Sequence, residues 1–315
     1  MRDQSTGFDA AARLMRLATY ASVATATVLA ILKLVAWVMT DSVSLLSTLI
    51  DSLLDVAASL VTLFAIRQAL TPADNEHRFG HGKAEPLASL GQAAFITGSS
   101  LLLFVQAVPR LFEPQPLEQP VIGFGVMGFS IVATFVLTRF QAMVSRRTGS
   151  LAIKADSAHY LSDLLVNVSV IVAFVLSSEL GWYLADPICA LLVAFYILWT
   201  AWSIARGSLD MLMDRELPDE ERQRIRAFVL AQPEVRGVHD LRTRASGPHR
   251  FVQMHLELDP QLSLARAHQI TDALERRLEA EFSVEVLVHQ DLHDPSKGRR
   301  GPLHRQQQQS TGVAR

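Results

Sequence analysis

The 315-residue sequence has a single cysteine, Cys189, so the chain can form neither an intramolecular disulfide nor a cysteine-rich metal site. It also lacks an excess of either charge, since 29 Lys and Arg residues stand against 31 Asp and Glu residues. Binding to phosphate backbones needs a concentrated basic face, and the basic residues here are scattered, which argues against a nucleic-acid partner. No nucleophile and base pair stands out, so we do not expect an enzyme.

Hydrophobic residues make up half of the chain, and the mean hydropathy is +0.23. Crossing the hydrocarbon core of a membrane takes roughly 20 apolar residues in a helix. Six windows reach that length: 18–39, 42–66, 86–108, 121–143, 155–178 and 187–205. The first window is too long for a signal peptide and has no small-residue cleavage site. The sequence therefore predicts a polytopic α-helical membrane protein with six transmembrane helices.

Basic residues in short loops predict the orientation of these helices. They precede the first window, separate the second from the third, and flank the gap between the fourth and fifth: Arg2, Arg13, Arg16, Arg67, Arg78, Lys83, Arg139, Arg146, Arg147 and Lys154. The other loops carry almost none, Arg110 being the exception. We therefore expect both termini in the cytoplasm.

From about Met213 the sequence becomes charged and alternating, which indicates a soluble domain. It reads as helix, strand, strand, helix and strand over residues 217–232, 235–245, 249–259, 264–282 and 283–291. This order predicts a small α+β domain with helices on one face of its sheet. The expected divisions are a cytoplasmic N-terminal segment, the membrane domain, the cytoplasmic domain and a disordered tail, at 1–17, 18–210, 211–292 and 293–315.

Two carboxylates, Asp51 and Asp55, interrupt the second apolar window in the stretch IDSLLD. Four residues apart on a helix, they lie on one face about one turn from each other. An ionised Asp at mid-bilayer costs about 2.5 to 3.5 kcal/mol or more, so a pair demands compensation. The structural alternative is that both are protonated or capped and pack against hydroxyl groups of neighbouring helices.

His159 and Asp163 repeat this spacing in the fifth window. Two helices with these pairs can supply three carboxylates and one imidazole to a single ion. Such a set suits tetrahedral zinc and is acceptable to ferrous iron, cadmium or manganese. A buried imidazole bonded to a serine is the commoner use of such a histidine, but the matched spacing on two helices favours a metal site.

Two further groups of histidines lie outside the apolar windows. Asp74, His77 and His81 share a loop after the second window, where they could bind a metal or form a solvated turn. In the soluble domain, each candidate alone reads as a surface residue, whereas together they could hold two ions bridged by Asp291: His239, His255, His268, His289 and Asp291.

Several ordered blocks of the sequence resemble the cation diffusion facilitator family, in its bacterial ferrous-iron and zinc efflux branch. They are IDSLLD, PADNEHRFGHGKAE, HYLSD, DRELPDEE, HDLRTR and VHQD, within residues 10–292. The resemblance implies six spans, a cytoplasmic domain of ferredoxin-like (metallochaperone-like) fold, a homodimer, and a bacterial inner-membrane location. It also implies that Asp51, Asp55, His159 and Asp163 form the transport site.

The same resemblance assigns three further features. It implies a second, weaker metal site at the 74–81 loop and a binuclear site at the dimer interface of the cytoplasmic domain. It also implies a salt bridge between Lys83 and Asp214 at the hinge between the two domains. Three other histidines, His249, His293 and His304, match no ligand position of the family.

The expected function is a divalent metal cation:proton antiporter that exports Zn²⁺ or Fe²⁺, and also Cd²⁺, by alternating access. Metal bound in the cytoplasmic domain would be regulatory. Family members selective for manganese typically carry Asn in place of an Asp on the second span, which this chain does not. The alternatives are a membrane-bound metal sensor, for which no output domain is visible, and a proton-coupled exporter of organic cations, which would have little use for the imidazole.

Overall fold

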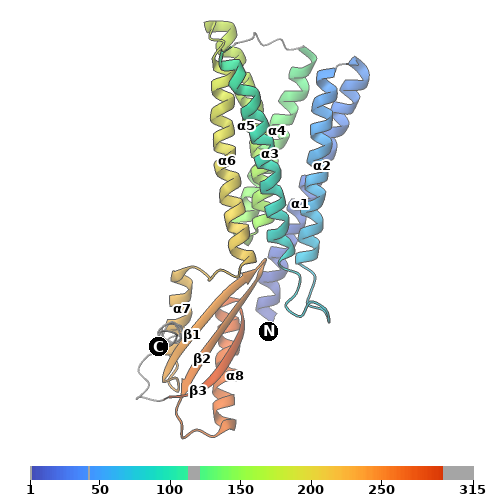
Figure 1. Cartoon of the computed structure of the whole chain (residues 1–315). Coiled ribbons are helices and arrows are strands. Elements are labelled where there is room, and N and C mark those ends of the chain that lie inside the picture. The colour runs from blue at the N-terminus through green and yellow to red at the C-terminus, as the bar shows by residue number, and fades with distance from the viewer. Residues whose placement is uncertain (1, 42, 113–120, 294–315) are drawn as a thin grey trace, which may run out of the picture. The chain divides into compact units, whose positions relative to one another are not determined.

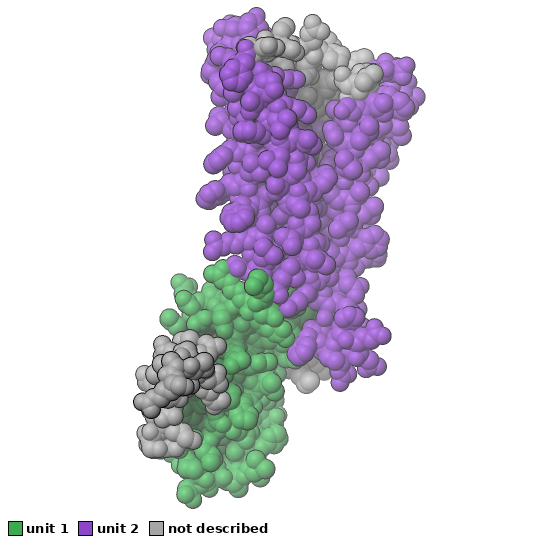
Figure 2. Space-filling model, viewed as in Figure 1, with its two compact units in different colours: residues 1–4, 213–315 green, residues 5–212 purple. Residues whose placement is uncertain are grey.

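The computed structural model describes residues 2–41, 43–112 and 121–293 (Figure 1). The expected disordered tail, apart from His293, lies outside the described residues. The chain divides into two compact units, coloured separately in Figure 2. We call residues 5–212 the helical unit and residues 213–293 the α+β unit, and describe each by itself.

The helical unit consists of long helices that run side by side in Figure 1. They are α1 (Arg2–Thr40), α2 (Val43–Ala69), α3 (Ala84–Phe112), α4 (Val121–Thr148), α5 (Leu151–Leu180) and α6 (Ala185–Leu212). Each contains a stretch long and apolar enough to cross a membrane. The prediction of six transmembrane helices is confirmed, although the helices extend beyond the apolar windows at most of their ends.

Small residues allow α3, α5 and α6 to approach one another closely. The most extensive helix–helix interface joins α3 and α6. The cluster among the three helices is rich in alanine: Ala93, Ile96, Ala155, Ala158, Ile197, Ala201 and Ile204. Within a membrane, such interfaces depend on close van der Waals packing because lipid offers no hydrophobic driving force for helix association.

Polar groups fix the connection between α4 and α5. Gly149 has φ of 71°, a backbone conformation that favours glycine, and Ser150 then caps α5 by accepting a hydrogen bond from the Ile153 amide. Glu85 of α3 is 1% exposed, and its carboxylate accepts a hydrogen bond from the Ala152 amide at 3.3 Å. A carboxylate at this position complements the helix dipole and ties α3 to the start of α5.

Arg110, the exception among the loops predicted to carry few basic residues, has an ion-pair partner. Arg110, near the end of α3, lies 3.1 Å from the Asp186 carboxylate at the start of α6. The pair lies at one end of the α3–α6 interface, so the positive charge is locally balanced.

The α+β unit contains α7 (Asp219–Leu230), β1 (Gly237–Ser246), β2 (His249–Leu258), α8 (Leu264–Phe282) and β3 (Glu285–Leu292). The strands form one sheet in the order β1-β2-β3, with β1 antiparallel and β3 parallel to β2. Helix α8 provides the crossover that a parallel pair requires. This arrangement confirms the predicted α+β domain and its order of elements.

The strand alternation separates a core face from a polar face. Val252, Met254, Leu256 and Leu258 of β2 are all buried and pack against α7 and α8. The opposite face therefore carries the alternating residues of β2 and β3, including all the candidate ligands on these strands.

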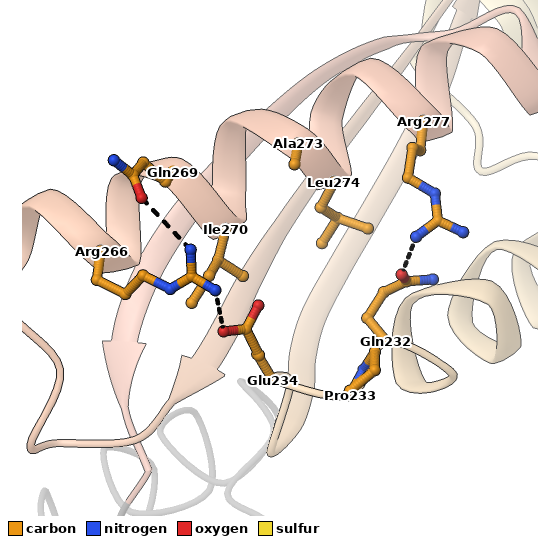
Figure 3. A pocket seen from close by; sticks show the side chains of 9 residues that line it. All are labelled: Gln232, Pro233, Glu234, Arg266, Gln269, Ile270, Ala273, Leu274 and Arg277. Carbon is orange, nitrogen blue, oxygen red and sulfur yellow. Dashed lines mark hydrogen bonds and ion pairs between the residues drawn. The ribbon is translucent and has the colours of Figure 1, made fainter.

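Ion pairs and hydrogen bonds join α8 to the segment between α7 and β1 (Figure 3). Arg266 lies 2.6 Å from the Glu234 carboxylate, and Arg277 donates a hydrogen bond to the Gln232 side chain. These contacts line a pocket whose floor includes the apolar side chains of Ile270 and Leu274. Because both arginines already have partners, the pocket serves the packing of α8 and offers no free cluster of charge.

A buried polar network links four helices of the helical unit. The Asp156 carboxylate on α5 accepts hydrogen bonds from Ser22 of α1 at 2.6 Å and Gln141 of α4 at 2.5 Å. Ser22 also lies 3.0 Å from the Ser59 hydroxyl of α2, which in turn lies 2.6 Å from the Tyr160 hydroxyl. Hydrogen bonds are directional, so this network fixes the register of α1, α2, α4 and α5.

We predict that Asp156→Ala destabilises the helical unit by about 1 to 3 kcal/mol, because it leaves buried Ser22 and Gln141 donors without an acceptor. Thermal unfolding in detergent measures the loss. Glu179→Ala, at an exposed position of the same helix, is the control and should unfold like the wild type. Equal unfolding of both variants would contradict the role of the network.

Candidate metal sites

The first site lies between α2 and α5, within the membrane-spanning stretches. His159 is 4% exposed, and its Nε2 atom lies 3.0 Å from Asp55 Oδ1 and 3.8 Å from Asp163 Oδ2. Ligand atoms of the three residues all lie within 4.8 Å of one another. The ring of Phe95 from α3 packs edge-on against the imidazole. A divalent ion placed among these atoms would have one nitrogen and two carboxylate ligands.

Asp51 lies one helical turn before Asp55 on α2 and is not part of this close group. Its side chain is exposed within the single chain. The structure thus brings together three of the four residues expected at the transport site, and the role of Asp51 as a ligand stays a prediction.

Asp156, one turn before His159 on α5, was not predicted from the sequence to be a functional residue. The available signal was its helical spacing, since residues three apart share a face. Its place at the start of an apolar window made it resemble an ordinary terminal polar residue, whereas the structure buries it in the network described above.

The second group is the loop cluster of Asp74, His77 and His81. The Asp74 carboxylate lies 3.4 Å from a ring nitrogen of each histidine, and the two rings are 4.5 Å apart. Asp74 also accepts backbone hydrogen bonds from Glu76 and His77, which gives the loop a defined turn. The backbone hydrogen bond from His77 lowers the pKa of Asp74 and keeps it ionised, as a metal ligand must be.

The third group lies on the polar face of the sheet in the α+β unit. The strand register places His239, His255 and His289 side by side on β1, β2 and β3. Asp291 Oδ2 lies 3.2 Å from His239 Nε2 and 2.9 Å from His255 Nδ1. His239, His255 and Asp291 form a close group that could hold a metal ion, and all three are about one-third exposed, which leaves them accessible.

Electrostatics keep the central carboxylate of this cluster charged. Partial burial alone would raise the pKa of Asp291, but the hydrogen bond to His255 and the charges of His255, His289 and His239 outweigh it and lower the pKa. His289 contributes through its Nε2 atom, 3.4 Å from Asp291 Oδ1. His268 lies on α8, exposed and outside the close group, so its participation stays a prediction.

A β-bulge shapes the edge of this site. The β1–β2 register shifts between His239 and Arg242, and Asp240 at the shift has φ of 50°. Asp240 receives two hydrogen bonds from Arg242 and lies 3.9 Å from His255. A shallow pocket lies beside this bulge and is lined in part by Asp240, His255 and His289.

Glu257 contacts the Nδ1 atom of His239, and this contact was not predicted from the sequence. Its Oε1 atom lies 3.0 Å from His239 Nδ1, and its Oε2 atom lies 2.8 Å from His293 Nδ1. Gly237, its cross-strand neighbour, makes room for this, because a Cβ there would lie 2.6 Å from Oε2. A carboxylate bound to one ring nitrogen orients the other nitrogen of a histidine toward a metal.

The salt bridge expected between Lys83 and Asp214 would join the two units and stays a prediction. Within the helical unit, the Lys83 ammonium donates to the Leu212 carbonyl at 3.3 Å. Within the α+β unit, Asp214 lies 3.4 Å from an Arg244 nitrogen.

Six helices able to span a membrane, with a histidine–carboxylate group between two of them and another such group in the following α+β unit, are the features of a membrane protein that handles metal cations. Family models match in both parts: the cation efflux transmembrane domain over residues 19–213, and the cytoplasmic domain of cation efflux proteins over residues 217–293. The chain therefore belongs to the cation diffusion facilitator family, as the sequence motifs predicted. As a member it is a transporter and not an enzyme.

Characterised relatives match along nearly their whole length. The cation-efflux pump FieF of Pectobacterium atrosepticum is 48% identical over 281 residues, which cover 89% of this chain and 93% of the relative. FieF of Salmonella choleraesuis is 44% identical over 294 residues, covering 92% and 98%. Two solved structures of a proposed zinc transporter, CzrB, are 36% and 34% identical and cover 25% and 28% of this chain, with TM-scores of 0.24 and 0.25; they cover 99% of the CzrB chains.

We predict that Glu257→Gln weakens zinc binding at the cluster of the α+β unit by about 10- to 100-fold, because His239 loses its orienting carboxylate. Calorimetric titration of the full chain in detergent measures this, with Asp55→Asn present throughout to suppress binding between α2 and α5. Glu281→Gln, at an exposed position, is the matched control. Unchanged zinc affinity in Glu257→Gln would show that Glu257 does not position the ligand.

Proposed function

We propose that this chain exports divalent metal ions from the cytoplasm in exchange for protons. The observation that carries the proposal is the close group of Asp55, His159 and Asp163 between two membrane-spanning helices. Charged side chains within a membrane are costly and mark ion pathways. The efflux pumps that match nearly the whole chain support the direction of transport.

Proton coupling follows from the chemistry of these ligands. A metal ion binds only deprotonated carboxylates and a neutral imidazole, so loading expels protons and protonation expels the metal. A histidine titrates near physiological pH, which makes His159 the expected carrier of the exchanged proton. Its Nε2 atom lies 3.0 Å from Asp55 Oδ1, so a proton shared by the two residues would lie between these atoms.

Movement of α2 and α5 relative to α3 and α6 would expose the site to each side of the membrane in turn. The polar network ties α2 and α5 to α1 and α4. Helices α3 and α6 pack against α5 through a cluster rich in alanine, and hydrogen bonds join Gln92 of α3 to α2 and Glu85 of α3 to the start of α5. Sliding of packed helices past one another is an established type of conformational change, and here it would break the hydrogen bonds of Gln92 to α2 and of Glu85 to α5.

The donor set favours zinc, and ferrous iron and cadmium are further substrates that we propose. Imidazole suits zinc and iron, while carboxylates accept harder ions. We further propose that the chain acts as a homodimer in the bacterial inner membrane with both termini in the cytoplasm. The basic residues at the α2–α3 and α4–α5 connections support this orientation, because cytoplasmic loops carry the excess of Lys and Arg.

Inverted membrane vesicles with an imposed pH gradient test the proposed antiport. We expect zinc uptake that depends on the gradient, and Asp55→Asn should reduce it at least about tenfold because a ligand is lost. Asp272→Asn, at a side chain of α8 that is 45% exposed and pairs with Arg276 on the surface, is the control and should transport normally. A metal sensor would show no uptake, and an exporter of organic cations would be insensitive to zinc. Zinc uptake that does not depend on the pH gradient would contradict the proposed exchange of metal ions for protons.

We also propose that metal bound by His239, His255 and Asp291 activates transport when cytoplasmic metal is abundant. A His255→Ala, Asp291→Ala variant should then lose the rise in transport rate with metal concentration while keeping basal transport. Initial rates across a zinc series measure this, with His249→Ala as the control. Equal transport by the variant and the wild type across the series would contradict a regulatory role.

A further inference from the structure

Lys33 is a basic residue within the membrane-spanning stretch of α1, which runs from Asp9 to Thr40. A helical side chain leans toward the N-terminus of its helix, so Lys33 points away from the near end at Thr40 and toward the middle of the span. An intramembrane lysine is costly unless it has a partner or reaches the interface. Its position therefore requires an explanation.

The Lys33 ammonium is bound to α2 at the level of the transport site. Its Nζ atom donates to Ser52 Oγ at 2.6 Å and to the Thr48 carbonyl at 3.3 Å. Ser52 is 1% exposed and directly follows Asp51. Because Ser52 lies between Asp51 and Asp55 on α2, this hydrogen bond places the positive charge of Lys33 beside the acidic residues of that helix.

The four ligands expected at the transport site, a bound divalent ion and Lys33 together carry no net charge. Asp51, Asp55 and Asp163 carry three negative charges when a metal ion is bound, and a divalent ion supplies two positive charges. His159 is neutral as a ligand. The ammonium of Lys33 supplies the third positive charge, so the loaded site is neutral, which a low-dielectric environment strongly favours.

We propose that Lys33 is a positioning residue of the transport site, whose fixed positive charge neutralises the metal-loaded carboxylates. This inference rests on the proposed function. The ammonium has two consequences for transport. It weakens the attraction of the acids for the metal ion enough for release, and it removes the net charge that the loaded site would otherwise carry through the membrane.

A purely structural role predicts different behaviour. The hydrogen bonds from Lys33 to Ser52 and Thr48 also join α1 to α2, and a clamp of this kind needs a donor but no charge. Lys33→Gln keeps a hydrogen-bond donor and removes the charge, whereas Lys33→Arg keeps both. Ser52→Ala removes one acceptor and leaves the charge in place, which makes it the matched control.

Zinc transport into inverted vesicles separates these roles through KM and kcat. For Lys33→Gln we expect both KM and kcat to fall, each at least about fivefold, because the more negative site binds the ion more tightly and releases it slowly. Lys33→Arg should restore both values toward those of the wild type. Ser52→Ala should change neither strongly. Rates are measured above neutral pH, where protons compete least with the metal.

Three outcomes would overturn the proposal: unchanged kinetics in Lys33→Gln, a defect in Lys33→Arg as large as that in Lys33→Gln, or the same defect in Ser52→Ala. Lys33→Met provides a second neutral variant should Lys33→Gln fail to fold, and must show the same joint fall. If the wild type transports no zinc, the proposed function itself is refuted. If the wild type transports zinc and the Lys33 variants have the same KM and kcat as the wild type, only the role of Lys33 is refuted.

Discussion

The cost of placing charge in an apolar bundle governs the organisation of the helical unit. Asp55, His159 and Asp163 lie inside the membrane-spanning stretches, where an unpaired charge is strongly disfavoured. The His159 imidazole lies 3.0 Å from the Asp55 carboxylate and 3.8 Å from that of Asp163, so the three groups can satisfy one another. A divalent ion bound by the two carboxylates and a neutral imidazole would compensate the buried negative charge in the same place, and loading it would release the protons that these groups hold.

The six helices are held by two different kinds of interaction. Directional hydrogen bonds around Asp156 join α1, α2, α4 and α5, whereas alanine-rich packing joins α3 and α6 to α5. Polar networks resist changes of register, while close apolar packing of small residues permits sliding. Helix α5 takes part in both and carries His159 and Asp163, so the ligands lie at the boundary between the two groups of helices.

The sequence predicted those features that depend on a single helix or strand. Apolar length identified the six spans, and the alternation of Val252, Met254, Leu256 and Leu258 identified the core face of β2, which the structure confirms. Contacts between different helices and strands could not be predicted from the sequence. Glu257 was visibly on the same face as His255, but its contact with His239 depends on the bulge at Asp240 and on the space left by Gly237. The burial of Asp156 likewise depends on Ser22 and Gln141 from other helices.

The near absence of cysteine bears directly on the chemistry of the three candidate metal sites. All three groups are built from histidine and aspartate, and Cys189 belongs to none of them. Thiolates bind soft ions such as zinc and cadmium tightly, whereas imidazole and carboxylate ligands exchange metal for protons near neutral pH. A transporter must release what it binds at every turnover. Sites made only of nitrogen and oxygen ligands meet that requirement better than thiolate sites, because protonation of the ligands near neutral pH releases the ion.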